Sequence, residues 1–110
     1  MTEQDQTAVI AALNDACRAE PGAGWMLTSG VAALSEANLA RAVAAVAAFS
    51  DFSEDNDPHA ERDFGAFEVD GQRLMWKIDY YDLDLCTASP DPADPAVTKR
   101  VLTLMLAGEY

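Results

Sequence analysis

The chain has 110 residues, half of them hydrophobic, which is enough for one domain with its own core and too few for two. Nineteen acidic residues outweigh seven basic ones and give a net charge of −12. A surface of this charge repels nucleic acid and anionic membranes, so we expect neither as a direct partner, whereas a basic protein surface would be attracted.

Cysteine content and the first residues indicate the compartment. Cys17 and Cys86 are far apart and form no C-x-x-C pair, so the chain lacks the pattern of a disulfide framework or a structural zinc site. The first six residues are acidic where a signal peptide is basic, and charges interrupt every apolar run before it reaches the length of a membrane span. We therefore expect a cytoplasmic protein.

The first half of the chain predicts a helix, a strand and a second helix. Residues 5–19 carry apolar side chains at spacings of three and four, which is typical of an amphipathic helix. This stripe consists of Val9, Ile10, Leu13 and Cys17. The proline and glycines at 21–24 end the helix, and the apolar segment 25–31 predicts a buried strand. Ser35 is a favourable N-cap for a second helix.

A hairpin is predicted around Asp70-Gly71, because this dipeptide favours a type I′ turn. The turn pairs Glu68 with Arg73 and places Gly65 opposite Trp76, where the missing side chain leaves room for the indole. The same register sets Arg62 against Asp79. One face of the hairpin is then apolar, and its members are Phe67, Val69, Leu74, Trp76, Ile78 and Tyr80.

The last predicted element is a helix over residues 95–107, which follows a proline- and aspartate-rich loop. Asp94 is an N-cap, and Pro95 occupies the first helical position. The buried stripe would be Val97, Val101, Leu104 and Met105. The order helix, strand, helix, hairpin, helix predicts a single α+β domain over residues 1–110, with a three-stranded antiparallel sheet and the helices packed on one face.

Acidic residues are concentrated in the second half of the chain, where thirteen of the nineteen lie between Asp51 and Asp94. Within this region His59, Glu61 and Asp63 alternate, so their side chains would share one side of an extended segment. An imidazole and two carboxylates can bind a divalent metal ion or serve as a general base with its orienting partner. We expect no other catalytic residues, because the chain has neither a glycine-rich phosphate loop nor a nucleophile elbow.

From Asp51 onwards the chain resembles a bacterial family of unknown function, the domain-of-unknown-function family numbered 3768. The segments that carry the resemblance are DFSEDNDPH at 51–59, DFGAFE at 63–68, WKIDYYD at 76–82, SPDPADP at 89–95 and VLT at 101–103. The resemblance implies a short bacterial protein encoded near mobile elements, and it carries over no activity and no functional residues. Some relatives have histidine where this chain has Arg62, which weakens the metal-site hypothesis.

Three functional hypotheses follow. In the first, a non-catalytic protein presents carboxylates that imitate DNA to a basic partner such as a restriction or CRISPR nuclease. Its contact residues would be Glu54, Asp55, Asp57, Glu61, Asp82, Asp84, Asp91 and Asp94, with Tyr81 as an aromatic anchor. In the second, a small metal-dependent hydrolase or nuclease uses His59, Glu61 and Asp63. In the third, the free edge of the hairpin pairs with a second copy to form a homodimer.

Overall fold

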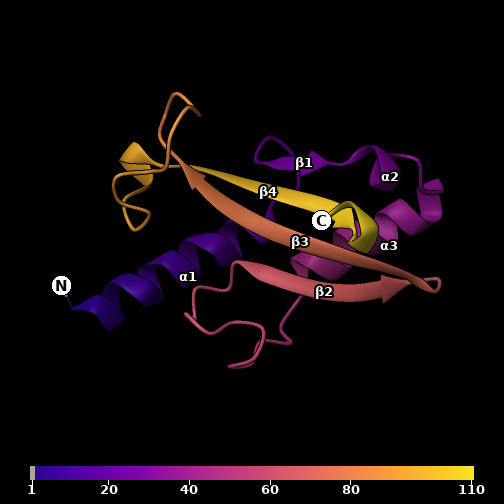
Figure 1. Ribbon diagram of the computed structural model, residues 1–110, viewed down its shortest axis with the longest axis horizontal. Coiled ribbons are helices and arrows are strands. Elements are labelled where there is room, and N and C mark those ends of the chain that lie inside the picture. The colour runs from indigo at the N-terminus through magenta and orange to yellow at the C-terminus, as the bar shows by residue number, and fades with distance from the viewer. Residues whose placement is uncertain (1) are drawn as a thin grey trace.

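The computed structural model describes residues 2–110, and its centre is a four-stranded sheet in the order β1-β4-β3-β2 (Figure 1). The strands are β1 (Trp25–Leu27), β2 (Phe64–Val69), β3 (Gln72–Tyr81) and β4 (Lys99–Leu106). β1 runs parallel to β4, and the other neighbours are antiparallel. The predicted α+β class is confirmed, but the prediction of three antiparallel strands was wrong because it missed β4.

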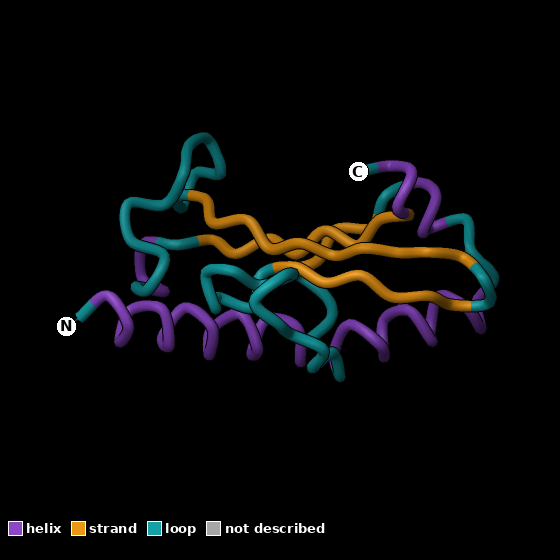
Figure 2. Tube along the Cα trace, turned by 60° about the horizontal axis from the view of Figure 1, so that its bottom comes forward, coloured by secondary structure: helices purple, strands orange, loops and turns teal. Residues whose placement is uncertain are grey.

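Helices cover one face of this sheet. α1 (Glu3–Ala19) and α3 (Glu36–Ala47) lie on the same side of it, and Figure 2 shows both below the strands. Both helices begin at a side-chain cap, since Thr2 Oγ1 accepts from the Asp5 amide and Ser35 Oγ accepts from the Asn38 amide. The predicted starts of the two helices are therefore right within a few residues.

The predicted strand at 25–31 is shorter than expected. Its hydrogen-bonded part ends at Leu27, and the backbone then enters the one-turn helix α2 (Ser29–Ala32). Val31 is consequently a helical residue, and it is fully buried against the sheet.

The hairpin register is confirmed pair by pair. Glu68 lies opposite Arg73 and Gly65 lies opposite Trp76. At the turn, Asp70 and Gly71 both have positive φ, as a type I′ turn requires.

The predicted cross-strand pair of Arg62 and Asp79 is wrong. Arg62 precedes β2 and binds Asp15 of α1 with 2.6 Å between Nη1 and Oδ2. Asp79 binds Lys77, two residues away on its own strand, at 3.1 Å. β2 begins at Phe64, so residue 62 lies in the preceding loop and outside the ladder of the hairpin.

The predicted helix over 95–107 is the second correction. Asp94 does cap a helical turn, accepting from the Ala96 amide at 2.9 Å, but this turn is the short 3₁₀ helix η1 (Pro95–Val97). The chain then extends into β4, which pairs with β3 over its whole length and with β1 on its other side. A second 3₁₀ turn, η2 (Ala107–Glu109), follows. An apolar run such as VLTLML satisfies the helical period and the strand period alike, and two sheet neighbours decide for the strand.

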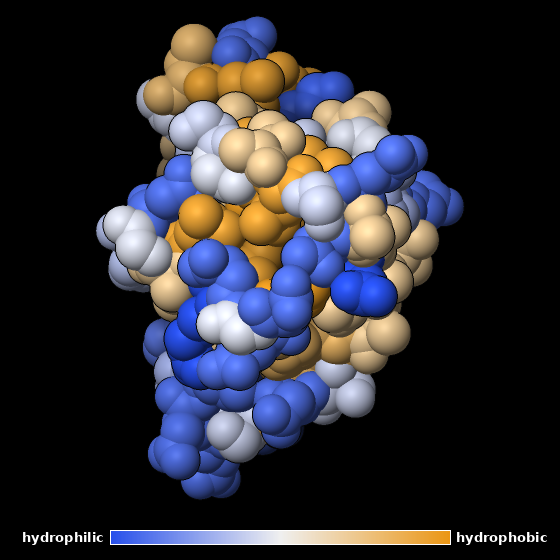
Figure 3. Space-filling view, turned by 90° about the vertical axis from the view of Figure 1, so that its right-hand side faces the viewer, coloured by the Kyte–Doolittle hydropathy of each residue, from blue (hydrophilic) through white to orange (hydrophobic). Residues whose placement is uncertain are grey.

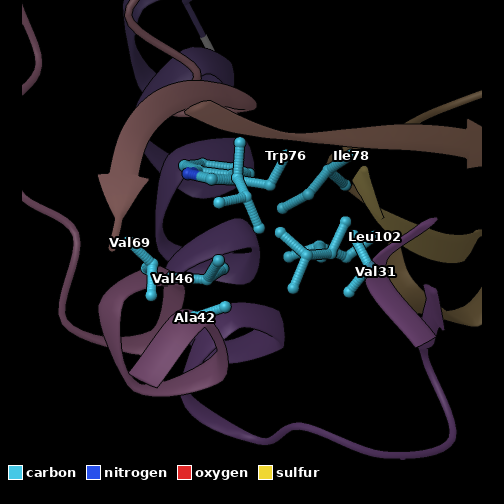
Figure 4. Packing of buried hydrophobic residues seen from close by; sticks show 9 residues of the cluster. Val31, Ala42, Val46, Val69, Trp76, Ile78 and Leu102 are labelled. Atoms are coloured by element: carbon cyan, nitrogen blue, oxygen red, sulfur yellow. The ribbon is translucent and has the colours of Figure 1, made fainter. Parts of the chain in front are cut away.

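The core lies between the sheet and α3, with Trp76 at its centre (Figure 4). The indole is fully buried, and Phe49 and Phe52 contact it edge-on with ring centroids 5.6 and 6.2 Å away. A Cβ at Gly65 would overlap the indole and lie 2.7 Å from Phe49 Cζ, which confirms that this glycine makes room for the tryptophan. Over residues 2–110, no helix combines the length and the apolar character that crossing a membrane demands.

Candidate functional site

The segment 51–63 between α3 and β2, called the acidic loop below, is held in shape by its own side chains. Asn56 accepts from the Ser53 amide at 2.8 Å and donates to the Asp51 carbonyl at 2.7 Å. Asp57 Oδ1 accepts from the Arg62 amide at 3.0 Å and closes the second half of the loop. These Asx-type bonds give the loop a defined backbone without any regular secondary structure.

A groove of about 1040 Å³ separates the acidic loop from the N-terminal half of α1. The helix contributes small side chains to it, including Ala8, Ala11 and Ala12. Its other lining residues carry an excess of negative charge. The carboxylates are Glu3, Asp15, Glu54, Asp57 and Glu61, and the nearby bases are Arg62 and the imidazole of His59. The Arg62 bond to Asp15 ties the two walls of this acidic groove together.

Beneath the groove lies a set of four polar side chains, called the Asn14 network below. Asn14 is fully buried, and its Nδ2 donates to Tyr80 Oη at 2.8 Å and to the Glu61 carbonyl at 3.0 Å. Tyr80 Oη in turn donates to Glu61 Oε1 at 2.8 Å. Arg100 Nε donates to Asn14 Oδ1 at 2.9 Å. The network therefore fastens the acidic loop to α1, β3 and β4 at once.

The same network reaches the second acidic region of the chain, residues 82–94. Arg100 Nη2 donates to the Pro92 carbonyl in that region, and the guanidinium stacks on the Tyr80 ring with 5.2 Å to the centroid. Two loops that are about 30 residues apart in sequence are thus joined through one buried asparagine.

Burial sets the protonation states around this network. Desolvation raises the pKa of Tyr80, and its hydrogen bond to the Glu61 carboxylate raises it further, so the phenol stays a neutral donor. Desolvation also raises the pKa of the half-buried Asp63 carboxyl, with the charge of Glu61 as the second cause. Burial raises the pKa of the Cys17 thiol despite the nearby Arg100, so this thiol is a poor nucleophile at neutral pH.

Arg18 is the second buried anchor of the region. Its Nη1 donates to the carbonyls of Val46 and Phe49, at 3.1 and 2.8 Å, and so satisfies the C-terminal end of α3. Its Nη2 binds Asp15 Oδ1 at 2.5 Å. Asp15 therefore bridges Arg18, which holds α3, and Arg62, which holds the acidic loop.

The predicted metal ligands do not converge. Ala60 and Arg62 have φ values of 56° and 58°, so the segment is not extended and the alternation of His59, Glu61 and Asp63 does not put them on one side. His59 is exposed, while the Glu61 carboxylate is bound within the Asn14 network. Across residues 2–110, no three His, Cys, Asp or Glu side chains are grouped so that they could hold a metal ion. The geometry therefore does not favour the metal-dependent hydrolase.

The predicted contact acids fall into two groups. Glu54, Asp55, Asp84 and Asp91 are exposed. The others are half-buried: Asp57, Asp82 and Asp94 accept from backbone amides, and the Glu61 carboxylate accepts from Tyr80 Oη.

Asp82 shows how firmly the second group is engaged. Its carboxylate accepts from Thr87 Oγ1 at 2.7 Å and from the Cys86 amide at 3.0 Å, and the bond from Thr87 is the main cause of its lowered pKa. Tyr81 lies elsewhere, on the sheet face away from α1 and α3, where it lines a separate hollow with Met26.

Sequence reasoning missed the residues that organise the site. Asn14 and Arg18 are the most buried polar side chains of α1, and they continue the line of Ile10 at intervals of four. Polar residues that extend an apolar stripe at helical spacing are the signal that could have found them, because such positions face the core. Their partners on β3 and β4 depend on the tertiary fold.

Comparison with known proteins gives a family and nothing further. A family model described as "Protein of unknown function (DUF3768)" matches residues 27–109, as the resemblance led us to expect. No protein of curated function and no solved structure matches the chain. The matched range contains Glu61, Tyr80 and Arg100 of the Asn14 network, whereas Asn14 and the rest of α1 precede it.

Proposed function

The chain belongs to the DUF3768 family, whose function is unknown, and we propose that it is a non-catalytic interaction protein whose acidic loop binds a basic partner. One observation carries the proposal: the acidic loop is ordered by its own hydrogen bonds and fastened to the scaffold by Arg62 and by the Asn14 network. A loop held in this way presents its exposed carboxylates in a fixed arrangement.

Pre-ordering supports a binding role because it lowers the entropic cost of association. A flexible acidic loop would lose conformational freedom when it bound, at about 0.5–1.5 kcal/mol for each immobilised long side chain in addition to the backbone cost. Here the backbone from Asp51 to Asp63 is already fixed, and Glu54 and Asp55 project from it into solvent.

The negative charge of the groove supports the same role and indicates that the partner surface is positively charged. Five carboxylates and one arginine line the acidic groove, and the chain as a whole carries −12. Figure 3 shows hydrophilic side chains gathered at the lower end of the molecule, where Figure 1 places the acidic loop. Such a field steers a positively charged surface toward the groove.

We propose that the partner surface is one that ordinarily binds DNA, because carboxylates and phosphates present the same charge to it. Duplex DNA carries one negative charge per about 1.7 Å of its axis, so a protein that binds it offers a dense array of Lys and Arg. A restriction or CRISPR nuclease is the partner class to test first, in keeping with the mobile-element biology that the family resemblance implies.

The test is inhibition of DNA cleavage by a panel of purified restriction and CRISPR nucleases. A variant with Glu54→Lys and Asp55→Lys reverses two charges on the acidic loop. The control variant carries Glu20→Lys and Glu36→Lys, which make the same change in net charge at two exposed positions away from the groove.

We expect inhibition by the native chain, at least tenfold weaker inhibition by the loop variant, and near-native inhibition by the control. Higher salt should weaken the complex, because its partners carry opposite charges. Equal losses in both variants would show that net charge alone acts, and a panel in which no nuclease is inhibited would refute the proposed partner class.

A further inference from the structure

One face of the sheet has no helix packed on it. α1 and α3 lie on the other side, and Figure 2 shows the strands flanked by segment 82–98 at one end and by η2, with α2 beside it, at the other. We call this surface the open face. The odd-numbered residues of β3 and β4 point onto it, since their even-numbered neighbours form the core.

Two apolar side chains of the open face are exposed, whereas Met105 of β4 is buried. Met26 of β1 is 60% exposed, and Leu85 in segment 82–98 is 56% exposed. Between them lies a hollow of about 420 Å³, to which Tyr81 and Val101 also contribute. A soluble chain normally covers apolar groups that gather in this way, so their exposure marks an interaction surface.

The open face also differs from the rest of the molecule in charge. Strands β2, β3 and β4 direct five charged side chains onto the open face: Glu68, Arg73, Lys77, Asp79 and Lys99. Three bases against two acids give the strand side chains of this face a net charge of +1, before the flanking acids are counted, whereas the chain carries −12. Both lysines of the chain are on it.

We propose that a second copy of the chain packs on the open face and forms a two-fold symmetric dimer. Two chains of −12 repel each other through every acidic surface, and the open face is where they can approach with the least repulsion. A two-fold axis brings the same apolar patch to both sides of the interface. The free edge of β2 is a less suitable dimer contact, because the acidic loop runs beside it (Figures 1 and 2).

The size of the face fits a weak dimer. Strands of 6, 10 and 8 residues, at about 3.4 Å per residue and about 4.8 Å apart, give the three long strands an area of roughly 400 Å². The flanking segment 82–98 adds Leu85, and the C-terminal end adds Tyr110, which is 77% exposed. The total stays below the roughly 800 Å² that each partner buries in an interface of standard size.

The experiment is sedimentation equilibrium of the full chain from about 5 to 500 µM, a range that covers interfaces at the weak end of the stable class. A reductant is present throughout, because Cys86 is exposed and could form a disulfide between chains. Two variants alter the open face, Met26→Asp for its apolar contact and Lys77→Glu for its charge. Their matched controls, Ala44→Asp and Arg41→Glu, make the same charge changes on the exposed side of α3.

We expect a dimer that tightens as salt is raised, because screening relieves the repulsion between like-charged chains. Each open-face variant should raise the dissociation constant at least tenfold, and the controls should leave it within twofold. A chain that stays monomeric up to 500 µM in high salt would overturn the proposal, as would a dimer that responds equally to the open-face variants and the controls. Either result leaves the nuclease test of the acidic loop unaffected.

Discussion

Removing one oxygen atom from the Asn14 network should loosen the acidic loop. In Tyr80→Phe the ring keeps its place beneath the Arg100 guanidinium, but the hydroxyl that accepts from Asn14 and donates to Glu61 is gone. Tyr81→Phe is the matched control, because the adjacent tyrosine points onto the open face and takes no part in the network.

The structure sets the size of the effect. A hydrogen bond to a charged group contributes about 1.5–3 kcal/mol to stability and a neutral one about 1 kcal/mol. Asn14 keeps its bond to the Glu61 carbonyl, and the half-buried Glu61 carboxylate can regain water, so part of this sum is recovered. We expect a loss of about 2 kcal/mol in the free energy of unfolding, which corresponds to a drop in Tm of roughly 8–16 °C for a chain near 100 residues.

Urea denaturation followed by the fluorescence of Trp25 and Trp76 measures the loss of stability, and hydrogen exchange measures where it acts. Exchange should accelerate at amides of the acidic loop, including that of Arg62, while the β3–β4 ladder stays protected below the unfolding transition. Equal stabilities for Tyr80→Phe and Tyr81→Phe, or unchanged exchange in the loop, would refute the role we assign to the network.

Two further changes test the packing and the electrostatics of the same region. Gly65→Ala should lower the free energy of unfolding by about 1–3 kcal/mol in urea denaturation, because its Cβ would overlap Trp76. Gly108→Ala is the control and should be neutral, because the space around its Cβ is open. Equal effects of the two substitutions would contradict this account. Asp63→Asn should stabilise the chain at pH 7, and the gain should shrink in melts as the pH falls toward 4. The raised pKa of Asp63 means that the folded state holds its proton more tightly than the unfolded state, so the favourable contribution exists at low pH and is lost as the pH rises through the folded pKa. A gain that is independent of pH would contradict this assignment.

Local signals predicted the elements that local chemistry determines. The Ser35 cap and the Asp70-Gly71 turn each depend on a few adjacent residues, and both are correct in the structure. Asp94 and Pro95 did start a helical turn, but the following residues could satisfy either a helix or a strand. The parallel partner β1 lies more than 70 residues earlier in the chain, so its pairing with β4 could not be read from the local pattern.

The candidate site, too, could be predicted only in part from local sequence. The acidic loop was identified from its composition, whereas its shape depends on Asn56 and Asp57 bonding to particular backbone groups. The loop is anchored by α1, through Asn14 and Asp15, at a distance of about 47 residues in sequence. Charge counting treats all carboxylates alike, and only the fold separates those that hold backbone from those that remain free to bind.

The position of β4 has a consequence for how the chain is made. β4 is the last strand in chain order, yet it lies between β1 and β3 and hydrogen-bonds to both. During synthesis the hairpin of β2 and β3 and both long helices emerge first, and Trp25–Leu27 has no strand to pair with until residues 102–104 leave the ribosome. The sheet is therefore completed by inserting an interior strand, and the nascent chain must keep an unfinished core accessible until β4 has been synthesised.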